Sequence, residues 1–246
     1  GAGDTDKAVR CFEAAIMTDP ELLEGYDLLA RAHYGAGSKK RAVRVLLHAV
    51  RQYPEAHALL RGLGQVFNEG RNPRKGIEYL RKALRIKPDN APYHHSFGNV
   101  LHDRGRKAHA EHHQALAVDL DPSFGAALNN LANAQRDRGD IQGAISTLAR
   151  AIAASPENLS YELNLASTLS GAERFEEATT HFQRVCALDP SHARAHNALG
   201  WALRMQHDYT SAARALRRAL ALAPWEVAPA FALADTLLAA GDVGGA

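Results

Sequence analysis

The chain has 246 residues, of which 46% are hydrophobic and 23% charged, an ordinary composition for a folded protein. Its formal net charge is +2, and acidic residues are interleaved with basic ones, so it lacks the dense basic stripe of a nucleic-acid binder. It has no apolar run near the roughly 18 residues that a membrane span needs, and no amino-terminal segment typical of a signal peptide. We therefore expect neither nucleic-acid binding nor a membrane span.

Proline recurs at a fixed spacing along the whole chain. The members of this series, each 34 positions after the last, are Pro20, Pro54, Pro88, Pro122, Pro156, Pro190 and Pro224. Small residues recur with the same spacing, as in the series Ala30, Gly64, Gly98, Ala132, Ala166, Gly200 and Ala234. Large apolar residues lie between them at steps of three and four, which is the helix period. Because proline closes helices and small residues let helices cross closely, the pattern predicts a repeated pair of helices.

In chain order, residues 1–22 are predicted to be the second helix of an earlier repeat. Six full repeats then follow, at 23–56, 57–90, 91–124, 125–158, 159–192 and 193–226. Residues 227–246 are predicted to be the first helix of a further repeat. Together they form one array over 1–246. Since the chain begins and ends inside a repeat, we expect it to be part of a longer protein.

The order of residues within each repeat resembles the tetratricopeptide repeat family. The shared features are a large residue, a leucine with a small residue, an aromatic, two alanines and the closing proline, and they cover the whole chain. The resemblance implies an all-α fold, an α-solenoid in which helix-turn-helix repeats wind into a right-handed superhelix. It also implies a protein–protein interaction scaffold, with no cofactor, that holds an extended peptide or partner segment in a concave groove lined by the first helix of each repeat.

Carrying the family's groove positions onto this sequence gives a polar set of candidate residues. They are Arg31, Arg61, Asn68, His95, Asn99, His102, Asn129, Asn130, Asn133, Arg136, Asn164, Arg194, Asn197, Trp201 and Arg204. Asn99, Asn130, Asn133 and Asn164 form a row, and an asparagine amide can both donate to and accept from a peptide backbone. The alternative is that these asparagines are only solvated.

The row can be compared with two known groove types. It is partly similar to the asparagine ladder in the repeat regions of O-linked N-acetylglucosamine transferases. The clamp that holds chaperone tails is matched only at its two asparagines, Asn133 and Asn164. Asn129, Arg194 and Ala198 stand where that clamp has Lys, Lys and Arg, so most of its cationic part is missing.

Histidine is concentrated in one repeat. Six of the 13 lie between residues 91 and 124, at His94, His95, His102, His109, His112 and His113. His109 and His113 share a helix face, as a two-histidine chelate would, but zinc sites generally have three or four protein ligands. We therefore expect these histidines to face water and predict no metal site, while incidental metal capture stays open.

The remaining sequence features concern chemistry and location. Cys11 and Cys186 are far apart and are expected to be unpaired and semi-buried, which favours a reducing compartment and hence the cytoplasm. The abundance of Arg and Ala suggests a GC-rich bacterial genome. We find no phosphate loop, His-Glu-x-x-His or Gly-x-Ser-x-Gly motif and predict no catalytic residue.

Two other functions stay open beside the scaffold. One is a non-catalytic recognition arm of a larger enzyme, such as a glycosyltransferase, sulfotransferase or hydroxylase. The other is self-association through exposed end helices, because the alanine- and leucine-rich last helix, 228–240, lacks a covering partner.

Overall fold

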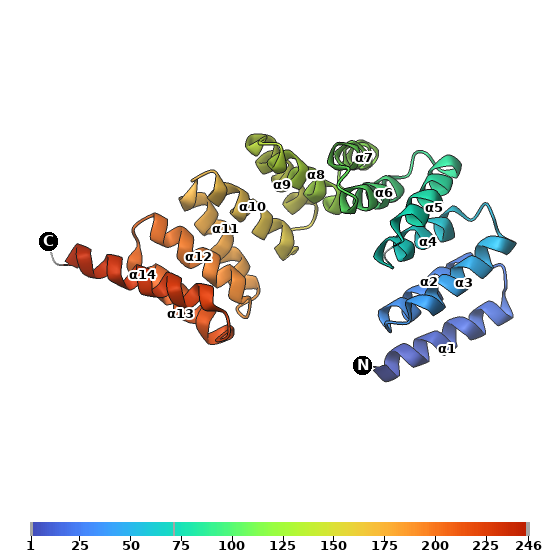
Figure 1. The fold of residues 1–246 in the computed structure, drawn as a ribbon, viewed down its shortest axis with the longest axis horizontal. Helices are drawn as coiled ribbons and strands as arrows, with labels where there is room; N and C mark the ends of the chain where they lie inside the picture. The colour runs from blue at the N-terminus through green and yellow to red at the C-terminus, as the bar shows by residue number, and fades with distance from the viewer. Residues whose placement is uncertain (1, 71, 245–246) are drawn as a thin grey trace. The chain divides into compact units, whose positions relative to one another are not determined.

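The computed structural model describes residues 2–70 and 72–244, so residues 1, 71, 245 and 246 of the predicted array lie outside it. The regular elements of the described residues are fourteen α-helices (Figure 1). The first helices of the repeats are α2 (Leu23–Gly35), α4 (His57–Glu69), α6 (Ala91–Asp103), α8 (Gly125–Asp137), α10 (Leu159–Gly171), α12 (Ala193–Met205) and α14 (Val227–Gly244). The second helices are α1 (Ala2–Thr18), α3 (Lys39–Gln52), α5 (Pro73–Ile86), α7 (Lys107–Leu120), α9 (Ile141–Ala154), α11 (Phe175–Leu188) and α13 (Tyr209–Leu222). The chain is an all-α helical-repeat solenoid, as the sequence predicted.

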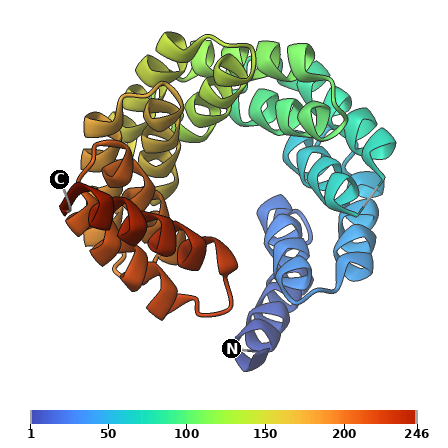
Figure 2. The same cartoon turned by 60° about the vertical axis from the view of Figure 1, so that its left-hand side comes forward.

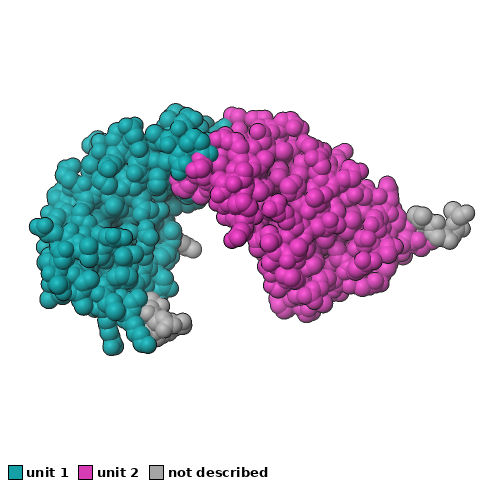
Figure 3. Space-filling model, turned by 180° about the vertical axis from the view of Figure 1, so that it is seen from behind, with its two compact units in different colours: residues 1–122 teal, residues 123–246 magenta. Residues whose placement is uncertain are grey.

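The helices form two compact units, residues 1–122 and 123–246, which Figure 3 colours separately. Unit 1 contains α1 to α7 and unit 2 contains α8 to α14. Within each unit, a helix packs against the next one in the chain, and first helices also contact the next first helix (Figure 2). This neighbour-to-neighbour packing is how repeat proteins build a core. The repeat boundaries and the single array stay predictions.

The two periodic series seen in the sequence have direct structural causes. Helix α3 ends at Gln52, two residues before Pro54, and every later second helix ends at the same distance from its proline. A Cβ atom on Gly64 would lie 2.5 Å from Leu80 Cγ, closer than carbon atoms can approach. The small residues therefore let paired helices cross closely, as the sequence indicated.

A third series, not noticed in the sequence, lies in the turns between the helices of a pair. A left-handed backbone occurs at Gly37, Gly105, Gly139, Glu173 and His207, which are multiples of 34 residues apart. Glycine adopts this conformation without steric cost, but other residues do not. Glu173 has φ 60° and His207 has φ 62°, so these two turns of unit 2 store backbone strain that the glycine turns avoid.

The two cysteines differ in their surroundings. Both are free thiols, as predicted, and Cys186 is half-buried. Burial, with a smaller effect from Asp189, raises the pKa of Cys186 to about 11. Cys11 is exposed, so the expectation that it is semi-buried is wrong.

A search of the described residues for membrane spans gave none, since their helices are too short or too polar to cross a bilayer.

Candidate partner-binding faces of the two units

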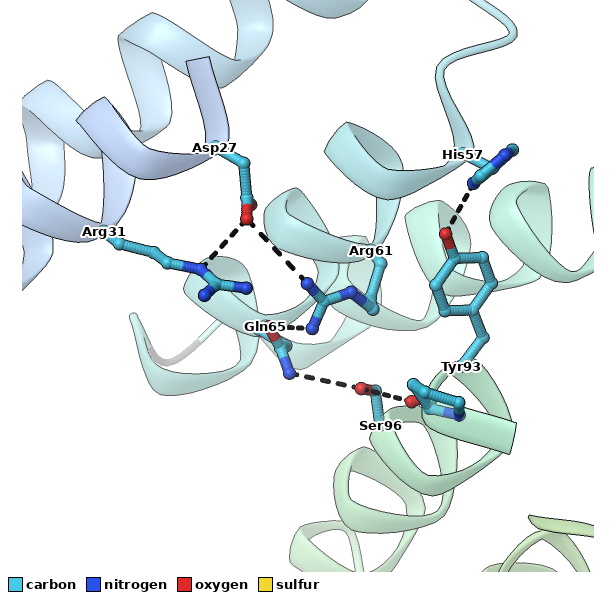
Figure 4. Close-up of polar contacts among 8 residues, drawn as sticks. Asp27, Arg31, His57, Arg61, Gln65, Tyr93 and Ser96 are labelled. Carbon is cyan, nitrogen blue, oxygen red and sulfur yellow. Dashed lines mark hydrogen bonds and ion pairs between the residues drawn. The ribbon is translucent and has the colours of Figure 1, made fainter. Parts of the chain in front are cut away.

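In unit 1, the Asp27 carboxylate joins α2 to α4, which are the first helices of two adjacent repeats. Asp27 Oδ2 lies 3.0 Å from Arg31 Nε on its own helix, α2, and 3.9 Å from Arg61 Nη2 on α4 (Figure 4). The side chains of Asp27 and Arg61 are only 15% and 17% exposed, whereas that of Arg31 is 61% exposed. Asp27 therefore fixes the Arg61 guanidinium in a largely desolvated position and leaves Arg31 accessible to a partner.

The same chain of contacts continues to the third first-helix. Arg61 Nη1 donates to Gln65 Oε1 at 3.2 Å, and Gln65 Nε2 donates to Ser96 Oγ on α6 at 3.2 Å (Figure 4). Near the carboxyl ends of α4 and α6, Asn68 Nδ2 donates to Asp103 Oδ2 at 2.6 Å. We call these polar side chains of α2, α4 and α6 the unit 1 face. Contacts within the chain hold its donors and acceptors in place across the first helices of three successive repeats.

Gln114 on α7 anchors the first asparagine of the predicted row. Its side chain is 3% exposed and stands where the aligned second helices carry Leu80 and Leu148. Gln114 Oε1 lies 2.8 Å from His95 Nδ1, Gln114 Nε2 donates to Asn99 Oδ1 at 2.9 Å, and Asn99 Nδ2 lies 3.2 Å from His95 Nε2. The three side chains form a closed ring that requires neutral His95 protonated on Nδ1. Burial lowers the pKa of His95, which favours this neutral form.

The six histidines of this repeat divide into two groups. His102, His109 and His112 are exposed, as expected. The expectation of solvent exposure is wrong for His113, which is partly buried, and His94 and His95 are partly buried too. Their burial has a physical cause, since the Nδ1 atoms of His94 and His113 lie 2.9 Å apart and the His113 ring packs edge-on against Phe97.

These contacts change how the histidines titrate. Burial, followed by the nearby His94, lowers the pKa of His113 to about 4. Among the residues that the structure describes, no three His, Cys, Asp or Glu side chains come together in a way that could hold a metal.

In unit 2, asparagines of α8 and α10 bond to each other. Asn164 Nδ2 donates to Asn129 Oδ1 at 2.6 Å, and Asn129 Nδ2 lies 3.4 Å from Asn130 Oδ1. The buried oxygens Asn133 Oδ1 and Gln135 Oε1, both on α8, accept no hydrogen bond from any described residue. An unsatisfied buried acceptor costs about 1–3 kcal/mol, so these two oxygens lower the local stability of α8. We call these amides, with the polar and aromatic residues of α12, the unit 2 face.

Helix α12 adds an aromatic and cationic part to the unit 2 face. Trp201 is 41% exposed, and its ring packs edge-on against Phe175 with centroids 5.4 Å apart. Arg204 Nη1 lies 3.7 Å from Asp235 Oδ2 on α14. The remaining candidates of this unit, Arg136, Asn197 and Arg194, are half-buried, half-buried and exposed respectively.

The last helix keeps apolar side chains in solvent. Trp225, just before α14, is 79% exposed, and Phe231 and Leu238 on α14 are 69% and 71% exposed. This is the exposed end that the sequence indicated, and self-association through it stays a prediction.

Gln114, which bonds His95 and Asn99 from α7, is the supporting residue that sequence reasoning missed. In the sequence it stood out only as a polar interruption of the apolar series Phe12, Leu46, Leu80, Leu148, Phe182 and Leu216. A buried polar residue needs partners. A glutamine at this apolar position therefore indicated that side chains of the paired helix form hydrogen bonds with it.

Comparison with known proteins identifies sequence profiles and solved structures that are similar to this chain. The chain matches the sequence profile of the tetratricopeptide repeat at residues 28–91, 98–158 and 163–226. A search of curated proteins gave no match. Among solved structures, a chain of the APC/C hetero-tetramer Cut9–Hcn1 is similar with a TM-score of 0.77 and 16% identity, over 96% of this chain and 46% of that one. This chain thus spans about half the length of that neighbour.

Two further solved structures are similar over most of their own length. PilF of Pseudomonas aeruginosa has a TM-score of 0.76 and 19% identity, covering 88% of this chain and 98% of that one. YrrB, described as a repeat protein of this type with an unusual peptide-binding site, has a TM-score of 0.65 and 18% identity, over 76% and 96% of the two chains. Identities this low show the fold alone.

Proposed function

The chain belongs to the tetratricopeptide repeat family, and on that premise we propose that it is a scaffold whose unit 1 face and unit 2 face each bind an extended peptide or partner segment. The observation that carries the proposal is the connected set of polar contacts from Asp27 through Arg61 and Gln65 to Ser96. Polar groups fixed before binding lose little conformational entropy when a partner arrives.

Peptide chemistry fits the groups that remain available. Exposed Arg31 can bind a carboxylate or a peptide carbonyl, and the amides of the unit 2 face can bond to main-chain groups irrespective of side chains. Each such hydrogen bond contributes about 1 kcal/mol net, which is about fivefold in affinity, so affinity comes from several bonds together. The peptide-binding site of YrrB, a protein of similar fold, supports the proposal.

The experiment is a pull-down from lysate of the source cells, followed by affinity measurements with the captured partner. One variant carries Gln65→Ala and Asn68→Ala in unit 1, and a second carries Asn129→Ala, Asn133→Ala and Asn164→Ala in unit 2. A matched control carries Gln183→Ala and Arg217→Ala, which are exposed on second helices. Circular dichroism and melting temperature confirm that all variants are folded.

We expect each face variant to weaken binding about fivefold for every partner hydrogen bond that it removes. The control should bind as the unmodified chain does. If both face variants retain full affinity while the control loses it, partners bind the second helices and the proposal is wrong.

A further inference from the structure

Unit 1 contains a cavity of about 800 Å³ between the second helices α1 and α3. Tyr26 and Leu29 of α2, which are 5% and 6% exposed, line it together with Ile16 of α1 and Val45 of α3. This volume lies within the roughly 300–1,000 Å³ of ligand sites, which are also mostly apolar. None of the unit 1 face residues lines the cavity, so it is a separate site.

The position of Val45 holds a larger side chain one repeat later. Tyr79 on α5 occupies the position 34 residues after Val45. Its ring stacks on Phe67 with centroids 5.6 Å apart and packs against Leu60 and Tyr93. Valine at the equivalent position lacks the aromatic ring that packs between the helices one repeat later. Tyr79 therefore shows that an aromatic side chain can be packed at the position that Val45 occupies.

Two polar groups at the cavity lack partners. Tyr26 is almost fully buried, yet its hydroxyl makes no hydrogen bond to any residue that the structure describes. Arg44 lines the cavity from the exposed side of α3 and forms no ion pair with a described residue. The Tyr26 hydroxyl and the Arg44 guanidinium can therefore both donate to a ligand that offers an acceptor.

The charge of the surroundings selects the sign of the ligand. Helix α3 has the sequence KKRAVRVLLHAVRQ, with five Lys or Arg side chains and no acidic residue. Arg44, His48 and Gln52 of this helix line the cavity, while Glu13 on α1 is the acidic residue of the lining. The net positive charge around Arg44 favours an anion over a cation.

We propose that this cavity binds a small amphiphilic carboxylate, with its apolar chain on Ile16, Leu29 and Val45 and its carboxylate on the Arg44 guanidinium. The Tyr26 hydroxyl supplies a second donor from the floor. Apolar lining for most of a ligand, with a few polar groups that fix its orientation, is the usual design of such sites.

The test is isothermal titration calorimetry of the chain with dodecanoate. Dodecyltrimethylammonium is the cation of the same chain length for comparison, and both are kept below their critical micelle concentrations. The variants are Val45→Tyr, which copies Tyr79 and fills the cavity, and Arg44→Gln, which removes the charge. Arg41→Gln, an exposed residue of the same helix outside the lining, is the matched control. Tyr26→Phe removes only the hydroxyl donor.

We expect saturable one-to-one binding of dodecanoate, at least tenfold weaker binding of the cation, and no binding to Val45→Tyr. Arg44→Gln should weaken dodecanoate binding about tenfold and Tyr26→Phe about fivefold, with Arg41→Gln unchanged within twofold. Because Arg44→Gln and Tyr26→Phe preserve the packing, they decide the question even if Val45→Tyr does not fold. Absence of saturable binding, full binding to a folded Val45→Tyr, or equal losses in Arg44→Gln and Arg41→Gln would overturn the proposal.

Discussion

Asp27 in unit 1 and Glu162 in unit 2 each bind two basic side chains, but Asp27 lies at a face of its unit and Glu162 in the interior of its own. Asp27 bonds Arg31 and Arg61 and joins two first helices at a partly exposed face. Glu162 has no exposed surface, and its oxygens lie 2.7 Å from His181 Nδ1 and 3.0 Å from Arg184 Nη1, which joins α10 to α11. A carboxylate bound by two basic side chains thus fixes side chains at a face of unit 1 and joins two helices in the interior of unit 2.

This difference sets the size of the effects that mutation should have. Removing a fully buried carboxylate is strongly destabilising because it leaves a void and breaks the hydrogen bonds that the carboxylate accepted. A pair with one exposed partner, such as Asp27 with the 61% exposed Arg31, contributes little, since water replaces the lost partner.

The largest effect is expected for Glu162→Ala. Loss of the buried carboxylate leaves a void between α10 and α11 and removes its contacts with His181 and Arg184, which should lower the free energy of unfolding by about 3 kcal/mol. Urea unfolding monitored by circular dichroism measures it, with Glu157→Ala, an exposed residue, as the control. Equal midpoints for the two variants would show that Glu162 does not brace unit 2.

Acid should act on unit 1 through His113. Its folded pKa of about 4 lies below the ordinary value of 6.5, so between these values the unfolded chain binds more protons. Proton binding by the unfolded chain therefore lowers the free energy of unfolding as the pH falls from 6.5 toward 4. The loss is about 2 kcal/mol at pH 5, and there is almost none above pH 6.5. We expect a lower melting temperature at pH 5 than at pH 7.5.

His113→Gln supplies the control for that experiment. It removes the titrating group next to His94 and Phe97, so the difference between the two melting temperatures should become smaller. An unchanged difference would assign the acid sensitivity to other groups.

A smaller effect is expected for Asp27→Asn at the unit 1 face. Arg61 loses its carboxylate but keeps Gln65, so we expect a loss of about 1 kcal/mol, less in high salt. Urea midpoints at low and high salt measure it, with the exposed Asp89→Asn as the comparison. A loss as large as that of Glu162→Ala would remove the distinction between the two carboxylates.

The smallest effect concerns the turns of unit 2. Glu173→Gly and His207→Gly relieve the left-handed backbone at those positions and should each stabilise by about 0.5 kcal/mol. Gly139→Ala, the reverse change at φ 90°, should destabilise by about 1 kcal/mol. Thermal melting of the three variants checks the order, and stabilisation by Gly139→Ala would contradict it.

The fold could be predicted from the sequence because its determinants are local and repeated. Pro54 and Gly64 act on helices adjacent in the chain, and each has counterparts 34 residues away that confirm the pattern. The turns at Glu173 and His207 were missed because neither residue type indicates a left-handed backbone.

The site could be predicted only in part. Helix periodicity placed Asn99 and His95 on α6, but it gave no information about Gln114 on the paired helix, which bonds both. Asn129 and Asn164 likewise find each other across 35 positions, through the packing of α8 beside α10. Partners of this kind depend on rotamers and on distances between helices, which a sequence pattern does not contain.

The unequal cysteines make the chain ready for site-specific chemistry without mutagenesis. A thiol reacts as its thiolate, and at neutral pH the half-buried Cys186, with its pKa raised to about 11, holds almost none. Cys11 is exposed on α1, the helix that forms one wall of the cavity. A maleimide fluorophore should therefore label Cys11 selectively and place an optical reporter next to that wall, where arrival of a ligand can be followed in real time.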